Sequence, residues 1–263
     1  MRETEKMTRP NQSSEKLLAV MELLSMQEEP VKLQTLANQL SMNVSTVLRF
    51  LTALQNKGYV TQDADSGRYY LTYKICRLAN RVASHIDFRN LAAPFLRSIS
   101  QIFGESANLS IEQNHMVVYI EVVNGPNQML TTLQRIGNIA PLHCTGVGKL
   151  FLLNYSVAQI DHLIAQKGLQ KFTDNTLTTK QALLDALDAA RKNGYAFDNE
   201  ECEIGARCVA APIRDFSGKV VAALSVSGPS TRMTDDLIFG KLPFLLDAAA
   251  QISLRLGFQD NAP

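Results

Sequence analysis

The sequence predicts an α+β protein with a small helical domain, a linker helix and a larger domain built on a largely antiparallel sheet. Three observations support this prediction. Three short amphipathic helices and a hairpin pattern fill roughly the first 75 residues. From Ser106 the hydrophobic period changes from the helical one to an alternation of two, which is typical of strands. A long apolar helical pattern from about residue 234 to 256 then closes the chain.

The composition sets limits on the class of protein. The chain has 263 residues, 46% of them hydrophobic, with a formal net charge of +1, which is enough to form one large core or two smaller ones. The N-terminus lacks an apolar secretory core, and no apolar run approaches the ~20 residues needed to cross a bilayer. The four cysteines form no CxxC pair. We therefore expect a cytoplasmic protein in a reducing compartment, with no membrane partner.

The first helix is predicted over residues 13–26 and the second over 32–40, both from apolar residues at helical spacing. A turn at 41–43 leads to a third helix over 44–57, with Asn43 as N-cap and Gly58 as the left-handed stop. On a helical wheel, this third helix has an apolar side made of Val44, Val47, Leu48, Leu51 and Leu54. Its other side carries Ser45, Thr46, Arg49 and Ala53.

Two helices joined by a tight turn, the second with a small, polar and cationic outer face, predict a DNA-binding helix-turn-helix. Small hydroxyls such as those of Ser45 and Thr46 allow close approach to phosphates, and Arg49 can bind phosphate or guanine. Segments YVTQ, DADSGR and YYLTY follow as strand, turn and strand, which predicts the wing of a winged helix-turn-helix. Arg68 lies near its tip and is the fourth candidate contact to DNA.

A polar helix face is by itself usually only solvated, and the DNA-binding prediction depends on the whole series of three helices and a hairpin. Residues 1–75 contain nine Lys and Arg against eight Asp and Glu. A domain with so small a positive excess needs dimerisation for useful affinity, so we expect a homodimer on double-stranded operator DNA.

The predicted domain limits are 1–75 for the winged helix-turn-helix, 76–88 for the linker helix and 89–263 for the second domain. In that second domain we expect strands over 106–113 and 115–123 joined by Gln113-Asn114, and a further strand over 129–136. Helices are expected near 89–103, 147–154, 157–167 and 179–193, the last with a capping box of Thr178 and Gln181. The remaining strands are expected over 201–215 and 219–228.

The stretch from Gly194 to Asp215 has a distinctive spacing of Asp198, Glu201, Cys208 and Ile213. At this stretch the sequence resembles the IclR family of bacterial transcription regulators. Three further motifs in the same order carry the resemblance: STVLRFLTAL (45–54), PLHCTGVGK (141–149) and LSVSGP (224–229). One departure is Arg214, where the family pattern has an aromatic residue or histidine. Because it lies beyond the pocket positions, we expect it to affect packing or an interface.

The resemblance implies a GAF-like C-terminal domain that binds a small carboxylate effector, often a keto acid, sugar acid or aromatic acid. It also implies a homodimer or a dimer of dimers on DNA. Matching the motifs residue by residue puts the effector against Gly146, Val147, Asp198, Cys208, Ser225 and Ser227. The residues around DNEE (198–201) resemble those of sugar-acid-responsive members of the family. Neither a cofactor nor a catalytic residue is implied.

The chemistry of these positions fits an anion. Gly146 and Val147 open a helix, where free backbone N–H groups favour negative charge. Ser225 and Ser227 are two apart on a strand and so face one side, and Asp198 can accept from a ligand hydroxyl. Each position also has a plainer interpretation: a solvated serine, a core cysteine at 208, or a turn cap at Asp198. Lys149 is expected to be solvated.

Two other functions use the same residue types. A metal-responsive regulator could use His143, Cys144, Asp198 and Cys208, with Cys202 nearby, although these lack the tight spacing of structural zinc sites. A cysteine-dependent enzyme would use Cys208 as nucleophile with His143 and Asp198, but a strand cysteine lacks the usual activation. We therefore predict a DNA-binding regulator that is not an enzyme.

Overall fold

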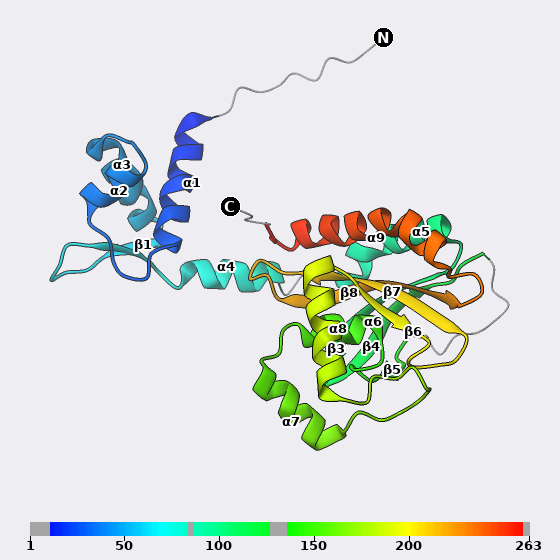
Figure 1. The fold of residues 1–263 in the computed structure, drawn as a ribbon. Coiled ribbons are helices and arrows are strands. Elements are labelled where there is room, and N and C mark those ends of the chain that lie inside the picture. The colour runs from blue at the N-terminus through cyan, green and yellow to red at the C-terminus, as the bar shows by residue number, and fades with distance from the viewer. Residues whose placement is uncertain (1–10, 84–86, 127–135, 260–263) are drawn as a thin grey trace, which may run out of the picture. The chain divides into compact units, whose positions relative to one another are not determined.

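The computed structural model describes residues 11–83, 87–126 and 136–259. The chain divides into two compact units, Met1–Ile86 and Asp87–Pro263 (Figure 1). This division lies close to the predicted start of the second domain. The separate linker over 76–88 stays a prediction.

The N-terminal unit contains three helices, a two-stranded hairpin and a fourth helix. The helices are α1 (Gln12–Ser25), α2 (Leu33–Gln39) and α3 (Val44–Asn56), and the antiparallel hairpin is formed by β1 (Val60–Gln62) and β2 (Tyr69–Leu71). Helix α4 (Lys74–Ala83) follows. Val20, Leu36, Val47 and Leu51 are completely buried where α1, α2 and α3 meet. The predicted winged helix-turn-helix is thus present as a fold.

Helix α3 differs from the prediction on one face. Val47, Leu51 and Leu54 are buried as expected, but Leu48 is 42% exposed and Val44 is 36% exposed. Asn43 holds the N-cap position, but its side chain makes no capping hydrogen bond. Gly58 follows the helix with a φ of 73°, as predicted for a left-handed stop. The small core formed with α1 and α2 therefore covers a narrower stripe than the five apolar residues on the wheel.

The C-terminal unit is built on a six-stranded sheet in the order β5-β4-β3-β8-β7-β6, in which every neighbouring pair is antiparallel. Strands β3 (Ser106–Gln113) and β4 (Met116–Val123) form one hairpin, and β7 (Ala206–Arg214) and β8 (Val220–Pro229) form another. The short strands β5 (Ile139–Ala140) and β6 (Ala196–Asn199) are the edges. The α+β class with an antiparallel sheet is confirmed.

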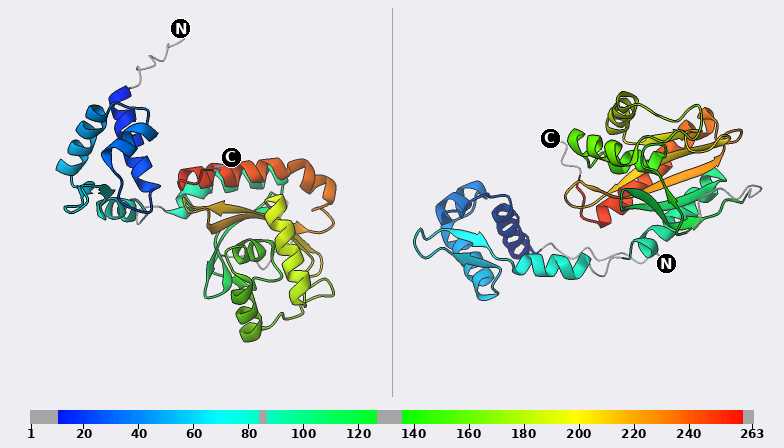
Figure 2. Two further views of the ribbon diagram at one scale, coloured as in Figure 1. Left: turned by 60° about the vertical axis from the view of Figure 1, so that its left-hand side comes forward. Right: turned by 90° about the horizontal axis from the view of Figure 1, so that it is seen from below.

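Helices cover both faces of this sheet. Helix α5 (Phe88–Phe103) lies beside α9 (Asp235–Arg255) on one face, and both pack on the central strands (Figures 1 and 2). Helices α6 (Gly146–Leu152) and α8 (Lys180–Asn193) pack on the other face, with α7 (Val157–Lys167) further out. Leu150, Phe151, Leu183 and Leu187 bury themselves there against alanines of β6, β7 and β8. This second face also carries the site described below.

Helix α9 corrects the expectation that no segment is long and apolar enough to cross a bilayer. By length and composition alone it qualifies. Its apolar residues include Ile238, Leu245 and Ile252, which are completely buried. Since α9 packs on α5 and β7, we interpret it as a core helix of the C-terminal unit.

Several local predictions were shifted or incomplete. The β3–β4 turn consists of Asn114 and His115, both with positive φ, one residue later than predicted. The side chain that caps α8 is that of Thr179, so the predicted box of Thr178 and Gln181 is wrong. Strand β6 was missed, and most of the strand predicted over 129–136 falls outside the described residues.

Two glycines give a stability prediction for the unit. A Cβ on Gly148 in α6 would lie 2.3 Å from the Leu142 carbonyl oxygen and 2.5 Å from its Cα. Because that contact is with backbone, Gly148→Ala should lower the free energy of unfolding by about 1–3 kcal/mol, as overpacking does. Gly240 in α9 has open space at the same position, so Gly240→Ala should be neutral or stabilising by up to ~1 kcal/mol. Urea denaturation of both variants measures the difference; equal stabilities would contradict the packing of α6.

Candidate functional site

The outer face of α3 presents the residues predicted to contact DNA. The side chains of Ser45 and Arg49 are exposed and that of Thr46 is half-buried. Within the described part of the chain, Arg49 makes no hydrogen bond or ion pair, so its guanidinium is available to an external acceptor. Leu48 and Thr52 are exposed on the same face, and the sequence interpretation had assigned Leu48 to the core. An exposed leucine at this position can contact a thymine methyl group.

The wing carries Arg68 at the end of a tightly bonded turn. The backbone N–H of Asp63 donates to the Arg68 carbonyl over 2.8 Å, and Gly67 N–H donates to the Asp63 carbonyl over 3.0 Å. The Ser66 hydroxyl and N–H both donate to the Asp63 carboxylate, which lowers the pKa of Asp63, with a smaller contribution from the charge of Arg68. Arg68 is half-buried on this ordered turn.

A cavity of about 220 Å³ lies in the C-terminal unit, between the ends of the central strands and the loops that precede α6 and α8. Three of the six predicted effector residues line it: Asp198, Cys208 and Ser227. Gly146, Val147 and Ser225 are not on its wall. The other lining residues include Tyr119, Thr145, Phe172, Cys202 and Arg207.

Strand register brings the predicted polar residues into one layer. Asp198 on β6 pairs with Cys208 on β7, and Cys208 pairs with Ser227 on β8. Ser225 pairs with Asn108 on β3. The buried Asn108 side-chain amide donates to the hydroxyls of Ser225 over 3.4 Å and Ser227 over 3.3 Å.

Asn108 was missed by the sequence interpretation. Its signal was a polar residue within a strand whose neighbours Ala107 and Leu109 are both apolar. The amide orients both serine hydroxyls and joins β3 to the layer of polar side chains.

Asp198 both caps a turn and lines the cavity, and its contact with a ligand stays a prediction. Its Oδ1 accepts from the backbone N–H of Glu201 over 2.8 Å and, more weakly, of Cys202 over 3.4 Å, so it caps the turn after β6. It also lines the cavity while only 8% exposed. Burial raises its pKa to about 7, although the hydrogen bond from Glu201 opposes the shift. Near neutral pH this carboxyl exists in both protonation states.

Cys208 is a buried wall residue of the cavity. Burial raises the pKa of its thiol to about 12, an effect that hydrogen bonds with Ser227 and Ser225 only partly offset. A thiol that stays protonated at neutral pH is a poor nucleophile. The residue therefore supplies shape and weak polarity, as the non-catalytic prediction expects.

The start of α6 lies beneath the cavity wall. Gly146 packs so closely on β6 that a Cβ there would be 3.0 Å from the Ala196 carbonyl oxygen. The N-cap is Thr145, which lines the cavity and accepts from Gly148 N–H over 3.1 Å. Among the described residues, the buried N–H groups of Gly146 and Val147 have no acceptor, as is usual in the first turn of a helix.

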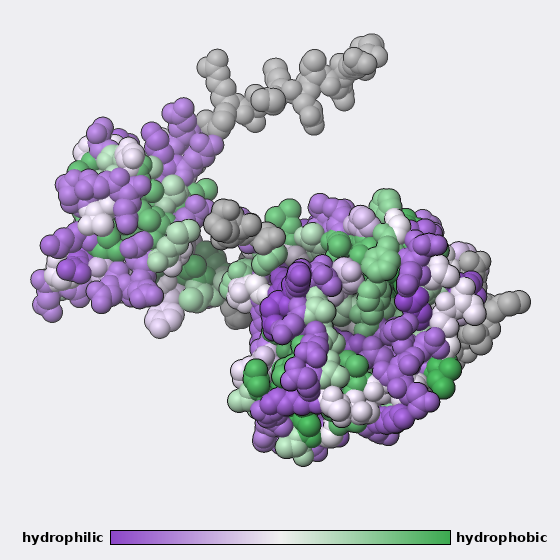
Figure 3. All heavy atoms as spheres, viewed as in Figure 1, coloured by the Kyte–Doolittle hydropathy of each residue, from purple (hydrophilic) through white to green (hydrophobic). Residues whose placement is uncertain are grey.

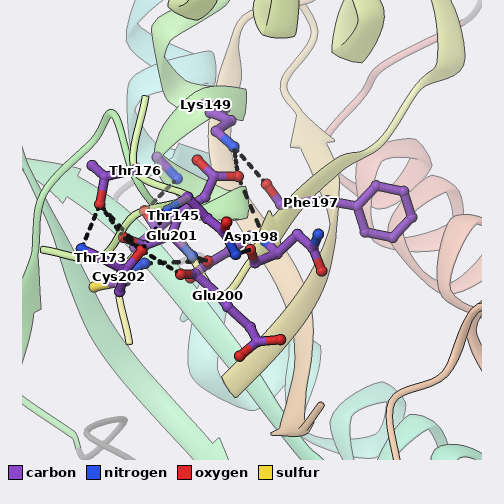
Figure 4. A network of polar contacts seen from close by, with 12 residues as sticks. Thr145, Lys149, Thr173, Thr176, Phe197, Asp198, Glu200, Glu201 and Cys202 are labelled. Atoms are coloured by element: carbon purple, nitrogen blue, oxygen red, sulfur yellow. Dashed lines mark hydrogen bonds and ion pairs between the residues drawn. The ribbon is translucent and has the colours of Figure 1, made fainter. Parts of the chain in front are cut away.

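Lys149 is buried, so the expectation that it is solvated is wrong. Its Nζ donates to the Glu201 carboxylate over 2.5 Å and to the Phe197 carbonyl over 2.8 Å (Figure 4). The hydroxyls of Thr173 and Thr176 donate to backbone carbonyls of Glu200 and Glu201 and fix the same turn from its other side (Figure 4). The turn after β6, which forms one wall of the cavity, is thus held by an ion pair and two threonines.

Arg207 is a second cationic residue that the sequence interpretation missed. It lines the cavity, and its guanidinium donates to the Met233 carbonyl and to Asp235, both over 2.7 Å. Its Nε is buried without a hydrogen-bond partner in the described structure. Its guanidinium is thus held beside the start of α9, and because neighbouring strand residues point to opposite faces of the sheet, it faces away from Cys208.

The residues named for a metal site do not form one. His143 Nε2 lies 2.9 Å from the Gln170 carbonyl oxygen, and the ring packs near Phe172. Over residues 11–83, 87–126 and 136–259, no group of three or more His, Cys, Asp or Glu side chains could hold a metal ion.

Comparison with known proteins gives matches along most of the chain. The family model described as "IclR helix-turn-helix domain" matches residues 13–64, and "Bacterial transcriptional regulator IclR C-terminal" matches residues 80–254. The regulator KdgR of Escherichia coli K12 is 32% identical over 245 residues, covering 93% of this chain and 92% of that protein. The repressor AllR of the same organism is 32% identical over 248 residues, or 94% and 91% of the two chains. The crystal structure of Thermotoga maritima IclR superimposes with a TM-score of 0.62 at 30% identity, covering 94% of this chain and 99% of that one.

Proposed function

The chain belongs to the IclR family of bacterial transcription regulators and is a DNA-binding regulator, and we propose that a small organic acid bound in the cavity changes its affinity for operator DNA. The relatives are regulators and not enzymes, in agreement with the prediction of a non-catalytic protein. The name of one relative, a transcriptional repressor, favours repression as the mode of action.

The proposed contacts to DNA are Ser45, Thr46 and Arg49 on α3 and Arg68 on the wing, to which we add Leu48. Ser45, Leu48 and Arg49 are exposed on one face of the second helix of a helix-turn-helix, and the guanidinium of Arg49 is unpaired in the described structure. Thr46 on α3 and Arg68 on the wing are half-buried. Paired heads would bind half-sites about 34–36 Å apart, or a multiple of this.

The observation that carries the effector proposal is the buried polar layer on the cavity wall. Asp198, Thr145 and Ser227 are polar residues on a cavity of about 220 Å³, and Asn108 orients the serine hydroxyl. A buried polar layer is costly without partners, so a ligand that hydrogen-bonds to it is favoured. The N–H groups without an acceptor at the start of α6 favour a carboxylate, and Asp198 favours a ligand hydroxyl. This combination points to a hydroxylated acid such as a sugar acid.

The proposed dimer has support in the surface of the C-terminal unit. Figure 3 shows hydrophobic side chains over α9 on the visible face. Phe239, Phe244 and Leu254 of α9 are each about half exposed. Such side chains suit burial against a second subunit.

A ligand screen tests the effector proposal directly. In a thermal-shift assay with aldonates, keto-deoxy sugar acids, pyruvate, glyoxylate and aromatic acids, we expect a hydroxylated acid to raise the unfolding temperature. Ser227→Ala should weaken that acid by about 1–2 kcal/mol, because one hydrogen bond is lost. Ser230→Ala is the matched control outside the cavity wall. An acid that binds Ser227→Ala as tightly as the wild type would remove Ser227 from the site.

Effector affinity should depend on pH through Asp198. The pKa of this carboxyl is raised to about 7, so it is neutral below that pH and an anion above it. Glu201 is already paired with Lys149 and Cys208 stays protonated, but Cys202, whose pKa is lowered, also lines the cavity, so a variant at Asp198 is needed to identify the part that comes from this carboxyl. The acid should bind roughly tenfold more tightly at pH 6 than at pH 8. Calorimetric titration measures this, and Asp198→Asn should remove most of the dependence.

The raised pKa of Asp198 also affects the stability of the folded protein. Between the ordinary pKa of 3.8 and about 7, the folded protein holds a proton on Asp198 that the unfolded chain has released. Stability contributed by this group therefore falls as pH rises through that window and is constant above it. A rise of stability across the same window in the wild type relative to Asp198→Asn would contradict the assignment.

A further inference from the structure

A second cavity lies in the C-terminal unit beside the one proposed for the effector. Its volume is about 300 Å³, and it is lined by parts of α7, the β3–β4 turn, the segment before α6 and the loop that follows α7. Its wall is mainly apolar and includes these side chains: Met116, Leu142, Leu163, Ile164, Leu169 and Phe172. Concave sites of this size with apolar walls are the usual form of small-molecule sites in proteins. The space therefore suits a ligand that is mostly hydrocarbon.

The wall carries a positive charge at Lys167, the last residue of α7. Its Nζ donates to the backbone carbonyl of Asn114 over 3.0 Å and, more weakly, to that of His115 over 3.5 Å. An ammonium group has three N–H donors, so one is still available after these two bonds. Within the described residues Lys167 makes no ion pair, and the described lining of the cavity contains no acidic residue. A ligand carboxylate would thus meet a cation and no competing anion on this wall.

The β3–β4 turn holds this lysine in place. Asn114 and His115, whose carbonyls accept from Lys167, have positive φ of 55° and 58°. The His115 ring nitrogen Nδ1 lies 2.7 Å from the Tyr155 hydroxyl oxygen, and this hydroxyl donates to the Glu112 carboxylate. Because the turn is fixed by these side chains, the ammonium group is already ordered and loses less freedom when it binds an anion.

The two cavities share part of their wall. Pro141 and Phe172 line both of them. His143 lines the second cavity and is only 7% exposed, with its Nε2 at 2.9 Å from the Gln170 carbonyl oxygen. The ring centroids of His143 and Phe172 are 6.1 Å apart. A molecule in the second cavity would therefore contact residues that also border the effector cavity.

We propose that the second cavity is a separate binding site for an aliphatic monocarboxylic acid, such as a medium-chain fatty acid. The hydrocarbon chain lies against Leu163, Ile164 and Leu169, and its burial supplies most of the affinity. The carboxylate lies beside the Nζ of Lys167. A sugar acid does not suit this wall, because its hydroxyls would be buried without hydrogen-bond partners.

The consequence for regulation rests on the proposed function. Since Pro141 and Phe172 belong to both walls, a fatty acid in the second cavity should change the affinity for the effector at least severalfold. Binding of the fatty acid itself is measured without effector or DNA, so it can fail or succeed independently of the proposed function.

Calorimetric titration of the full-length protein with sodium octanoate tests the proposal. We expect saturable binding of one octanoate per chain. 1-Octanol has the same hydrocarbon chain without the negative charge and should bind more weakly. Absence of octanoate binding to the wild type would overturn the proposal.

A pair of lysine variants tests where the carboxylate lies. Lys167→Met should weaken octanoate by roughly two- to fivefold, the range for an ion pair with an exposed lysine, and should leave the affinity for 1-octanol unchanged. Lys171→Met is the matched control, because Lys171 is an exposed lysine that pairs with Asp174 outside this wall. Equal affinity of Lys167→Met and the wild type for octanoate would overturn the assignment of an acid-binding site.

A pair of tryptophan variants tests where the hydrocarbon chain lies. Ile164→Trp fills part of the cavity and should abolish octanoate binding. Val157→Trp puts the same side chain at an exposed position of α7 outside the wall and should bind octanoate as the wild type does. Circular dichroism checks that each variant is folded, and Lys167→Met reports on the site even if Ile164→Trp is unstable.

Three results with folded variants would overturn the proposal. Octanoate binding that persists in Ile164→Trp, or that disappears in Ser227→Ala, would show that the acid occupies another place, in the second case the effector cavity. A lower mass of Ile164→Trp in light scattering would identify the second cavity as a contact between subunits.

Discussion

Arg49→Ala is expected to abolish specific operator binding while the effector domain stays intact. Arg49 is exposed on the outer face of α3, and its guanidinium has no acceptor in the described structure. A bidentate contact from such an arginine to guanine contributes about 1–3 kcal/mol, and the loss applies to each DNA-binding head. Fluorescence anisotropy with an operator obtained by selection from random DNA measures the change.

Two controls make this prediction specific. Arg191→Ala removes an exposed arginine of α8, in the other unit, and should leave operator affinity unchanged. Arg49→Ala should retain the wild-type response to an acid in the thermal-shift assay. If Arg49→Ala binds the selected operator as tightly as the wild type, then α3 does not contact the DNA bases.

Lys149→Met is expected to lower the free energy of unfolding by about 3–5 kcal/mol, because it leaves the buried Glu201 carboxylate without its cation. The Lys149 side chain is 5% exposed and that of Glu201 is 10% exposed, and one carboxylate oxygen already lacks a hydrogen-bond partner in the described structure. Urea denaturation measures the effect. The double variant Lys149→Met with Glu201→Gln should recover part of the loss, since it removes the unpaired charge.

The pair formed by Lys180 and Asp161 provides the comparison. It has a similar separation of 2.5 Å, but both side chains are close to half exposed. Lys180→Met should therefore cost at most about 1 kcal/mol. Equal losses for Lys149→Met and Lys180→Met would show that the charge of Glu201 is not buried in solution.

Most of the fold could be predicted from the sequence, because its helices and strands have local signals. The spacing of Leu17, Val20, Met21 and Leu24 marks α1, and alternation marks β3 and β4. The errors arise where residues far apart in the sequence determine whether a side chain is buried and what it pairs with. Leu48 has the spacing of a core residue, but in the folded domain it is 42% exposed. Lys149 resembles a surface lysine until the fold brings Glu201, 52 residues later, against it.

The candidate site was predicted in part. Asp198, Cys208 and Ser227 lie on the cavity wall. They belong to the neighbouring strands β6, β7 and β8, where the family motifs of the sequence lie. Asn108 and Arg207 could not be assigned in the same way. Asn108 comes to Ser225 and Ser227 only through the pairing of β3 with β8, across more than a hundred residues of sequence. The GAF-like classification and the roles of the individual site residues stay predictions.

The central claim is that occupancy of the cavity changes binding of the α3 face to DNA. Operator affinity, measured by anisotropy with and without an acid whose binding depends on Ser227, tests this claim most directly. A coupling of about 1–3 kcal/mol, or roughly a 5- to 150-fold change in the operator dissociation constant, is the predicted result. An acid that saturates the cavity and leaves the operator dissociation constant unchanged would contradict it.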